Sequence, residues 1–135
     1  MDRPLLVLLL PQRLEQMPQR ERIEQLLAAP GVVAVDPPRM RLGPTMAAAV
    51  APRQAKRMRL PGVPRALAVF DDAQIPLAGA LITRQPDAEL WSLAGPQPQA
   101  DFVFDLAAAA DLAPAWERME GLGIESGRLG SERLR

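Results

Sequence analysis

The sequence predicts one α/β domain in which a mainly parallel sheet of four or five strands is flanked by helices, a three-layer Rossmann-like arrangement. Two observations predict this fold. Short apolar runs alternate with segments whose apolar residues recur at three- and four-residue steps, as in β–α–β units. The first run, residues 4–10, is almost purely Leu and Val, which is typical of a strand buried on both faces. With 135 residues, the chain can bury one core without disulfides or metals.

The expected strands are short apolar runs that end near Pro, Gly or Asp. They lie at residues 4–10, 32–35, 65–70, 89–93 and 101–104. The last is the weakest element, because no helix fits between it and the strand before it, whereas regular β–α alternation would place one there. These patterns leave the order of the strands in the sheet open.

Four helical segments are expected, and each is marked by a residue that begins, breaks or ends a helix. Pro18 suits the first turn of the first one, before residue 30. Pro52 is expected to divide the second, residues 45–60, because its ring removes a helical hydrogen bond. Asp72 is placed to cap the third helix. Gly121 or Gly123 is placed to end the fourth, which makes the G-x-G sequence there a helix end and not a phosphate loop.

Composition restricts the chemistry that the chain can perform. Cysteine, histidine and tyrosine are absent, which excludes disulfides, thiolate and imidazole metal ligands and the commonest general base. The apolar residues 5–10 are too few for a secretory signal, and no run approaches the roughly 20 residues of a membrane span. We therefore expect a cytoplasmic domain at residues 1–125, followed by a polar, frayed tail at residues 126–135.

Charge is separated along the chain although the net charge is zero. No acidic residue lies between Asp36 and Asp71, and that interval holds seven basic residues. Within it, Arg53, Lys56 and Arg57 lie three and four residues apart and share one helical face. Such a face can meet anionic lipid, phosphate or an acidic partner, or it can simply be solvated. Nucleic acid is not expected, because no aromatic residue is interleaved with the cluster.

Polar side chains follow the predicted strands, and open parallel sheets bind ligands beyond the carboxyl ends of their strands. The candidate ligand-binding residues are Gln12, Arg13, Asp36, Asp71, Asp72 and Gln74. The loops after the later strands also contain Gly95, Gln97 and Asp105. These residues can lie along one edge of the sheet and bind a ligand there. Alternatively, they only cap helices and keep the rim of the sheet solvated.

Two kinds of site receive little support from these residues. Asp71 and Asp72 with Asp36 or Asp105 would suit a hard cation such as Mg²⁺, but a helix cap at Asp72 beside an exposed neighbour is the simpler interpretation, and no metal is expected. The first β–α turn, LLLPQRLEQMP, contains no glycine. Neither the dinucleotide fingerprint nor the P-loop is therefore present, and no cofactor is expected.

Residues 67–91, LAVFDDAQIPLAGALITRQPDAELW, resemble part of the N-terminal Rossmann-like half of GT-B glycosyltransferases. In those proteins a strand ends in a polar turn, a helix with a P-L-A-x-A-L-type start follows, and a short strand comes next. They hold the sugar-nucleotide donor mainly in a second domain. The resemblance therefore implies an acceptor-side domain that is not catalytically complete alone and needs a separate donor-binding domain or a homo-oligomer. The resemblance also implies that the basic face formed by Arg53, Lys56 and Arg57 is similar to the membrane-facing patches of some members of this family.

A second, local resemblance is to response-regulator receivers, in which an Asp at the end of the third strand precedes a D-x-x-M-P-like turn. Residues 72–76, DAQIP, match this turn. No acidic pair follows the first strand, however, and Asp105 stands where receivers carry a lysine after the last strand. This resemblance implies a degenerate receiver that binds protein without enzymatic activity. Whether the chain is an enzyme stays open.

Overall fold

The computed structural model describes residues 3–11, 14–37 and 43–128. In this part of the chain, five strands form one sheet in which every neighbouring pair is parallel, in the order β2-β1-β3-β4-β5. The strands are β1 (Pro4–Leu9), β2 (Val32–Val35), β3 (Val63–Val69), β4 (Glu89–Ser92) and β5 (Phe102–Val103). The helices are α1 (Arg20–Leu27), α2 (Pro44–Arg57), α3 (Ile75–Thr83) and α4 (Ala113–Gly121), with short 3-10 turns η1 (Leu14–Gln16) and η2 (Asp72–Gln74). The predicted three-layer α/β fold is confirmed.

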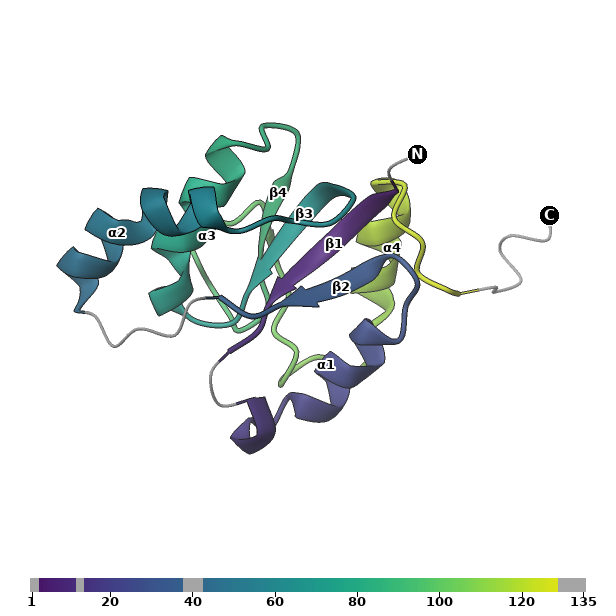
Figure 1. Cartoon of the computed structure of the whole chain (residues 1–135). Helices are drawn as coiled ribbons and strands as arrows, with labels where there is room; N and C mark the ends of the chain where they lie inside the picture. The colour runs from purple at the N-terminus through teal and green to yellow at the C-terminus, as the bar shows by residue number, and fades with distance from the viewer. Residues whose placement is uncertain (1–2, 12–13, 38–42, 129–135) are drawn as a thin grey trace.

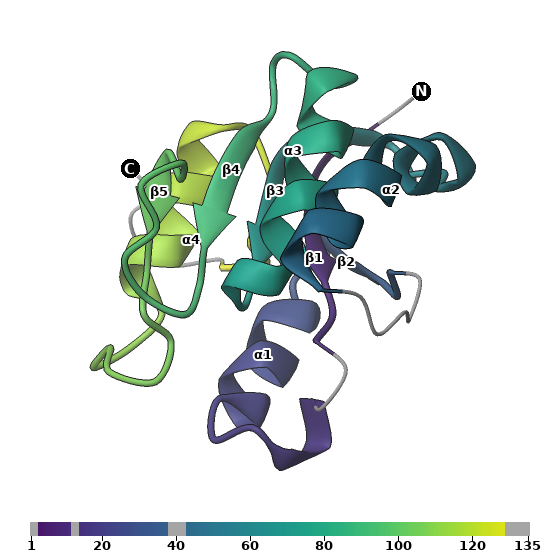
Figure 2. The same cartoon turned by 90° about the vertical axis from the view of Figure 1, so that its left-hand side faces the viewer.

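Helices cover both faces of the sheet (Figures 1 and 2), with α1 and α4 on one face and α2 and α3 on the other. The inner strand β1, between β2 and β3, serves both faces. It sends Leu6 and Leu8 toward α1 and α4, and Leu5, Val7 and Leu9 toward α2 and α3. All five side chains are buried. This two-sided burial explains why the first strand of the sequence is apolar without interruption.

A proline is accommodated in the central strand β3 by a bulge. Strand β3 begins at Val63, two residues earlier than predicted, and so includes Pro64. The register against β1 shifts between Leu5 and Leu6, so that Leu5 pairs with Pro64 and Leu6 pairs with Ala66. Proline cannot donate a hydrogen bond to the sheet, and bulges are among the few places where a sheet tolerates it.

Helix α2 is continuous through Pro52, so the prediction that this proline divides it was wrong. The proline ring leaves the carbonyl of Ala48, four residues earlier, without its helical partner. Ala48 and Pro52 are both exposed, so the unpartnered carbonyl lies on the solvent side of the helix, where water can satisfy it. Pro18 was predicted to lie in the first turn of the first helix. Helix α1 begins at Arg20, however, so Pro18 precedes the helix.

A glycine with positive φ ends α4. Gly123 has φ +78°, and its N–H donates to the carbonyl of Glu120 at 3.1 Å, while the N–H of Ile124 donates to the carbonyl of Met119 at 2.9 Å. These two bonds form a Schellman cap. They confirm that the G-x-G sequence ends a helix.

The chain after α4 is held against the body as far as residue 128. The Ser126 hydroxyl donates to Glu120 Oε2 at 2.6 Å, and the Arg128 guanidinium donates to both oxygens of the same carboxylate, at 2.9 and 3.2 Å. The N–H of Gly31 donates to the carbonyl of Glu125 at 2.9 Å. In the segment predicted to fray, Ser126 and Arg128 are therefore anchored, and residues 129–135 lie outside the described part of the chain.

Candidate ligand-binding site at the carboxyl edge of the sheet

The carboxyl ends of β3 and β4 open into a shallow depression of about 310 Å³. Its lining comes from the two strand ends and the loops that follow them. The lining residues are Val69, Phe70, Asp71, Asp72, Ser92, Ala94, Gly95, Pro96 and Gln97. The depression lies at the edge where open parallel sheets bind ligands, and its volume is at the low end of the range for small-molecule sites.

Asp71 and Asp72 give the depression its negative charge, and both are exposed. One Asp72 carboxylate oxygen accepts a hydrogen bond from Gln97 Nε2 at 2.8 Å, which joins the loop after β3 to the loop after β4. The predicted helix cap at Asp72 is not formed, because its side chain makes no capping bond to η2 or α3. Asp72 instead lies inside η2, and its carboxylate is turned to the neighbouring loop.

Ser92 shapes the floor of the depression. Its hydroxyl donates to the carbonyl of Gly95 at 2.6 Å and so closes a tight turn directly after β4. Both residues are buried, and Gly95 has φ +139°, a conformation that favours glycine. Sequence reasoning named Gly95 but missed Ser92, which lies within an apolar strand and carries no signal that would distinguish it from other strand residues.

Gln74 does not line the depression, although it was a candidate for ligand binding. Its side-chain oxygen accepts a hydrogen bond from the Phe70 N–H, and its Nε2 donates to the carbonyls of Leu9 at 2.8 Å and Leu10 at 3.4 Å. The amide thus ties the end of β1 to the end of β3. In this strand order, β1 and β3 flank the switch point, the crevice at which flavodoxin-like proteins bind ligands. Gln74 therefore acts as a structural tie across that crevice.

The remaining candidates at this edge lie apart from the depression. Asp36 follows β2, and β1 separates that strand from β3. Asp105 follows β5 and is used locally, since one of its carboxylate oxygens accepts from the N–H groups of Ala107 and Ala108 at 3.0 and 3.3 Å. Among the described residues, no group of three or more acidic side chains is arranged to hold a metal ion.

Gln12 and Arg13 lie outside the described residues. The basic candidates Arg53, Lys56 and Arg57 are exposed near the end of α2, and none of them lines the depression. The cationic side chains in this last turn also interact favourably with the negative end of the helix dipole.

Comparison of the chain with protein-family models, with curated proteins and with solved structures finds no match. The case for a function therefore depends on the depression at the ends of β3 and β4 and on the charged surfaces of the domain.

Proposed function

We propose that the chain is an acceptor-side domain of a glycosyltransferase-like protein, and that it binds a hydroxyl-rich ligand in the depression at the ends of β3 and β4. The observation that carries this proposal is the lining itself. It holds two carboxylates and one carboxamide, and no lysine or arginine is among its nine residues. A phosphate or carboxylate ligand would need basic groups there, whereas sugar hydroxyls pair well with carboxylate and amide oxygens and N–H groups.

The hydrogen bond between Asp72 and Gln97 supports this choice of ligand. It holds an acceptor and a donor next to each other on the rim. Gln97 uses one of its two amide N–H groups on Asp72, and Asp72 keeps its second oxygen as an acceptor. Asp71 adds a further carboxylate. With about 310 Å³ of space, we expect one small ring to fit better than a complete sugar nucleotide.

In this proposal the domain supplies only one half of an active site. A separate donor-binding domain, or a second copy of the chain, supplies the other half. Catalysis by this chain alone is not expected. A cytoplasmic location, expected from the absence of cysteine, accompanies the proposal.

Thermal unfolding in the presence of neutral glycosides, UDP-sugars and GDP-sugars tests the proposal. A ligand at 100 times its Kd stabilises a folded protein by about 2.7 kcal/mol. We expect neutral glycosides to stabilise the protein, and the double variant Asp71→Asn, Asp72→Asn to lose that effect. Asp87→Asn, at an exposed acid outside the depression, is the matched control and should keep it. If no glycoside raises the unfolding temperature of the unmodified protein, the proposal is wrong.

The strand order favours a second candidate, a protein-interaction module. The order β2-β1-β3-β4-β5 is that of flavodoxin and of response-regulator receivers, and differs from the 3-2-1-4-5-6 order of classical dinucleotide-binding domains. Asp71 and Asp72 follow the third strand, which ends at Val69, and Asp105 stands where receivers carry a lysine. A sensor kinase or regulator encoded beside this chain, with no stabilisation by any glycoside, would favour this candidate. Neighbouring genes for sugar-nucleotide synthesis would favour the first.

A further inference from the structure

Helix α2 lies on the outside of the molecule and packs against α3 with one side only (Figures 1 and 2). The inward side is formed by small residues, since Ala51 and Ala55 are 2% and 1% exposed. The guanidinium of Arg84 also donates to the carbonyl of Ala55 at 3.0 Å and so holds the end of α2. The opposite side of α2 faces solvent along its length.

That solvent-facing side combines apolar and basic residues. Met46, Ala49, Arg53 and Lys56 recur at steps of three and four residues and therefore lie on one stripe, apolar in its first half and basic in its second. Because α2 continues through Pro52, both halves stay on the same side of one helix. We define the α2 surface by six exposed residues, five on this side of α2 and one just after the helix: Met46, Ala49, Arg53, Lys56, Arg57 and Arg59.

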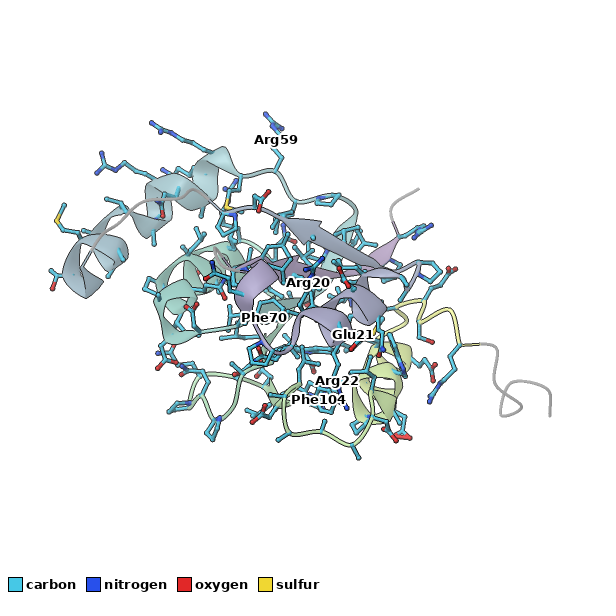
Figure 3. All side chains as sticks on the ribbon, turned by 90° about the horizontal axis from the view of Figure 1, so that it is seen from below. Arg20, Glu21, Arg22, Arg59, Phe70 and Phe104 are labelled. Atoms are coloured by element: carbon cyan, nitrogen blue, oxygen red, sulfur yellow. The ribbon has the colours of Figure 1, made fainter. Side chains whose placement is uncertain are left out.

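The positive charge of the α2 surface is not neutralised within the described part of the chain. No hydrogen bond or ion pair connects Arg53, Lys56, Arg57 or Arg59 to a described residue, whereas Arg20, Arg118 and Arg128, which lie on or after α1 and α4, do form ion pairs. Residues 43–70 contain no acidic side chain. Arg59 points away from the body (Figure 3). The cations are therefore available to an external anionic surface.

An anionic bilayer matches both halves of the α2 surface. Met46 is 54% exposed, which makes it the most exposed of the large hydrophobic side chains in the described residues. A helix that exposes apolar and basic groups on one side can lie in the interface of a membrane, with the cations at the headgroups and the apolar side chain below them. No helix in the described segments is long and apolar enough to span a membrane.

From this combination we infer that the α2 surface docks on anionic lipid membranes, with α2 lying along the bilayer and Met46 entering the headgroup boundary. An acidic protein would satisfy the cations but leave Met46 in water. A nucleic acid is disfavoured because the α2 surface has no aromatic side chain on which a base could stack. This inference is independent of the proposed ligand site, since none of its residues lines the depression.

Sedimentation with vesicles of phosphatidylcholine containing about 30% phosphatidylserine, at low salt, tests the docking. The protein should bind these vesicles, fail to bind pure phosphatidylcholine, and dissociate at about 1 M salt, where charges are screened within about 3 Å. Each basic residue contributes about fivefold to the partition constant, so Arg53→Gln, Lys56→Gln, Arg57→Gln should lower it about a hundredfold. Arg20→Gln, on α1 across the sheet, should leave it nearly unchanged.

Insertion of Met46 can be followed directly, because the chain contains no cysteine. Met46→Cys, labelled with a polarity-sensitive fluorophore, should shift to shorter emission wavelengths on phosphatidylserine vesicles. The same label at Glu117→Cys, an exposed position on α4, should not shift. Polyglutamate and single-stranded DNA should leave both labels unchanged.

Three results would overturn the docking inference. The first is that the unmodified protein does not bind phosphatidylserine vesicles. The second is that the triple variant binds them as well as the unmodified protein does. The third is that the emission of the Met46→Cys label shifts only with polyglutamate or DNA. Unaltered circular dichroism and unfolding temperature of the triple variant, whose changes are all at exposed positions, show that a loss of binding does not come from a loss of folding.

Discussion

Replacing Gln74 with leucine should destabilise the domain by about 2–4 kcal/mol. Leucine is close to glutamine in size, but it can neither accept from the Phe70 N–H nor donate to the Leu9 carbonyl. Phe70 and Leu9 are 3% and 0% exposed, so water does not readily replace the lost partners. Each buried polar group left without a partner costs about 1–3 kcal/mol, and the carbonyl is expected at the low end of that range because it retains a second lone pair for other donors.

Urea unfolding measures this loss. Trp91 is fully buried, so its fluorescence reports the transition. With a denaturant dependence of about 1.5 kcal/mol per M, a loss of about 3 kcal/mol lowers the midpoint by about 2 M. Gln85 is a matched control, because it is half-buried and its side chain has no hydrogen bond within the described residues. Gln85→Leu should move the midpoint by about 0.3 M or less.

A glutamate at position 74 adds a pH test of the same tie. Glutamate can accept from the Phe70 N–H, but only its protonated form can donate to the Leu9 carbonyl. The folded state therefore raises the pKa of this carboxyl, and the stability of Gln74→Glu relative to the unmodified protein falls as pH rises above about 4.3. If Gln74→Leu is as stable as the unmodified protein, Gln74 does not act as a structural tie.

Two further pairs of variants test local interactions. Glu89→Ala should lower the free energy of unfolding in urea by about 2 kcal/mol, because the buried Trp91 indole N–H loses its acceptor at 3.1 Å. Arg118→Ala should lower it by about 1 kcal/mol or less, because the Arg118 side chain, which pairs with Glu89, is 39% exposed. A larger loss for Arg118→Ala than for Glu89→Ala would contradict this account. Gly123→Ala should lower the unfolding temperature by about 4 °C, because φ is +78° there. Gly121→Ala should raise it slightly, since a Cβ at that helical position meets nothing within 4 Å, and a destabilised Gly121→Ala variant would show that the helix end is governed by something else.

The elements that the sequence predicts well are those whose limits are set by neighbouring residues. Strand β2 runs from Val32 to Val35, as predicted, because Gly31 precedes it and Asp36 with a following proline ends it. The burial of Leu77 and Leu81 on α3 also follows from their spacing in the sequence alone. In each case the information lies within a few residues, so a local pattern is sufficient.

The features that the sequence leaves undetermined depend on distant partners. Gln74 bonds to the carbonyl of Leu9, 65 residues away, and nothing near Gln74 in the sequence indicates this. The carboxylate of Asp72 turns to Gln97 in the next loop, which local capping rules do not anticipate. Pro52 was expected to break α2, and only its exposed position in the folded protein explains why the helix continues. Strand order likewise depends on how the crossovers pack, which local spacing does not determine.

The contact between Gly31 and the chain after α4 bears on the order in which the domain is completed during synthesis. A Cβ at position 31 would approach a side-chain methyl carbon of Ile124 to 2.6 Å, so the two segments meet without space for any side chain. Ile124 belongs to the same core as Leu6 and Trp91. On the ribosome, the face covered by α2 and α3 can close once β4 has emerged, while the opposite face waits for α4 and Ile124. Between the emergence of β4 and that of Ile124, part of this second apolar face therefore stays uncovered in the nascent chain, and it is there that a chaperone would bind.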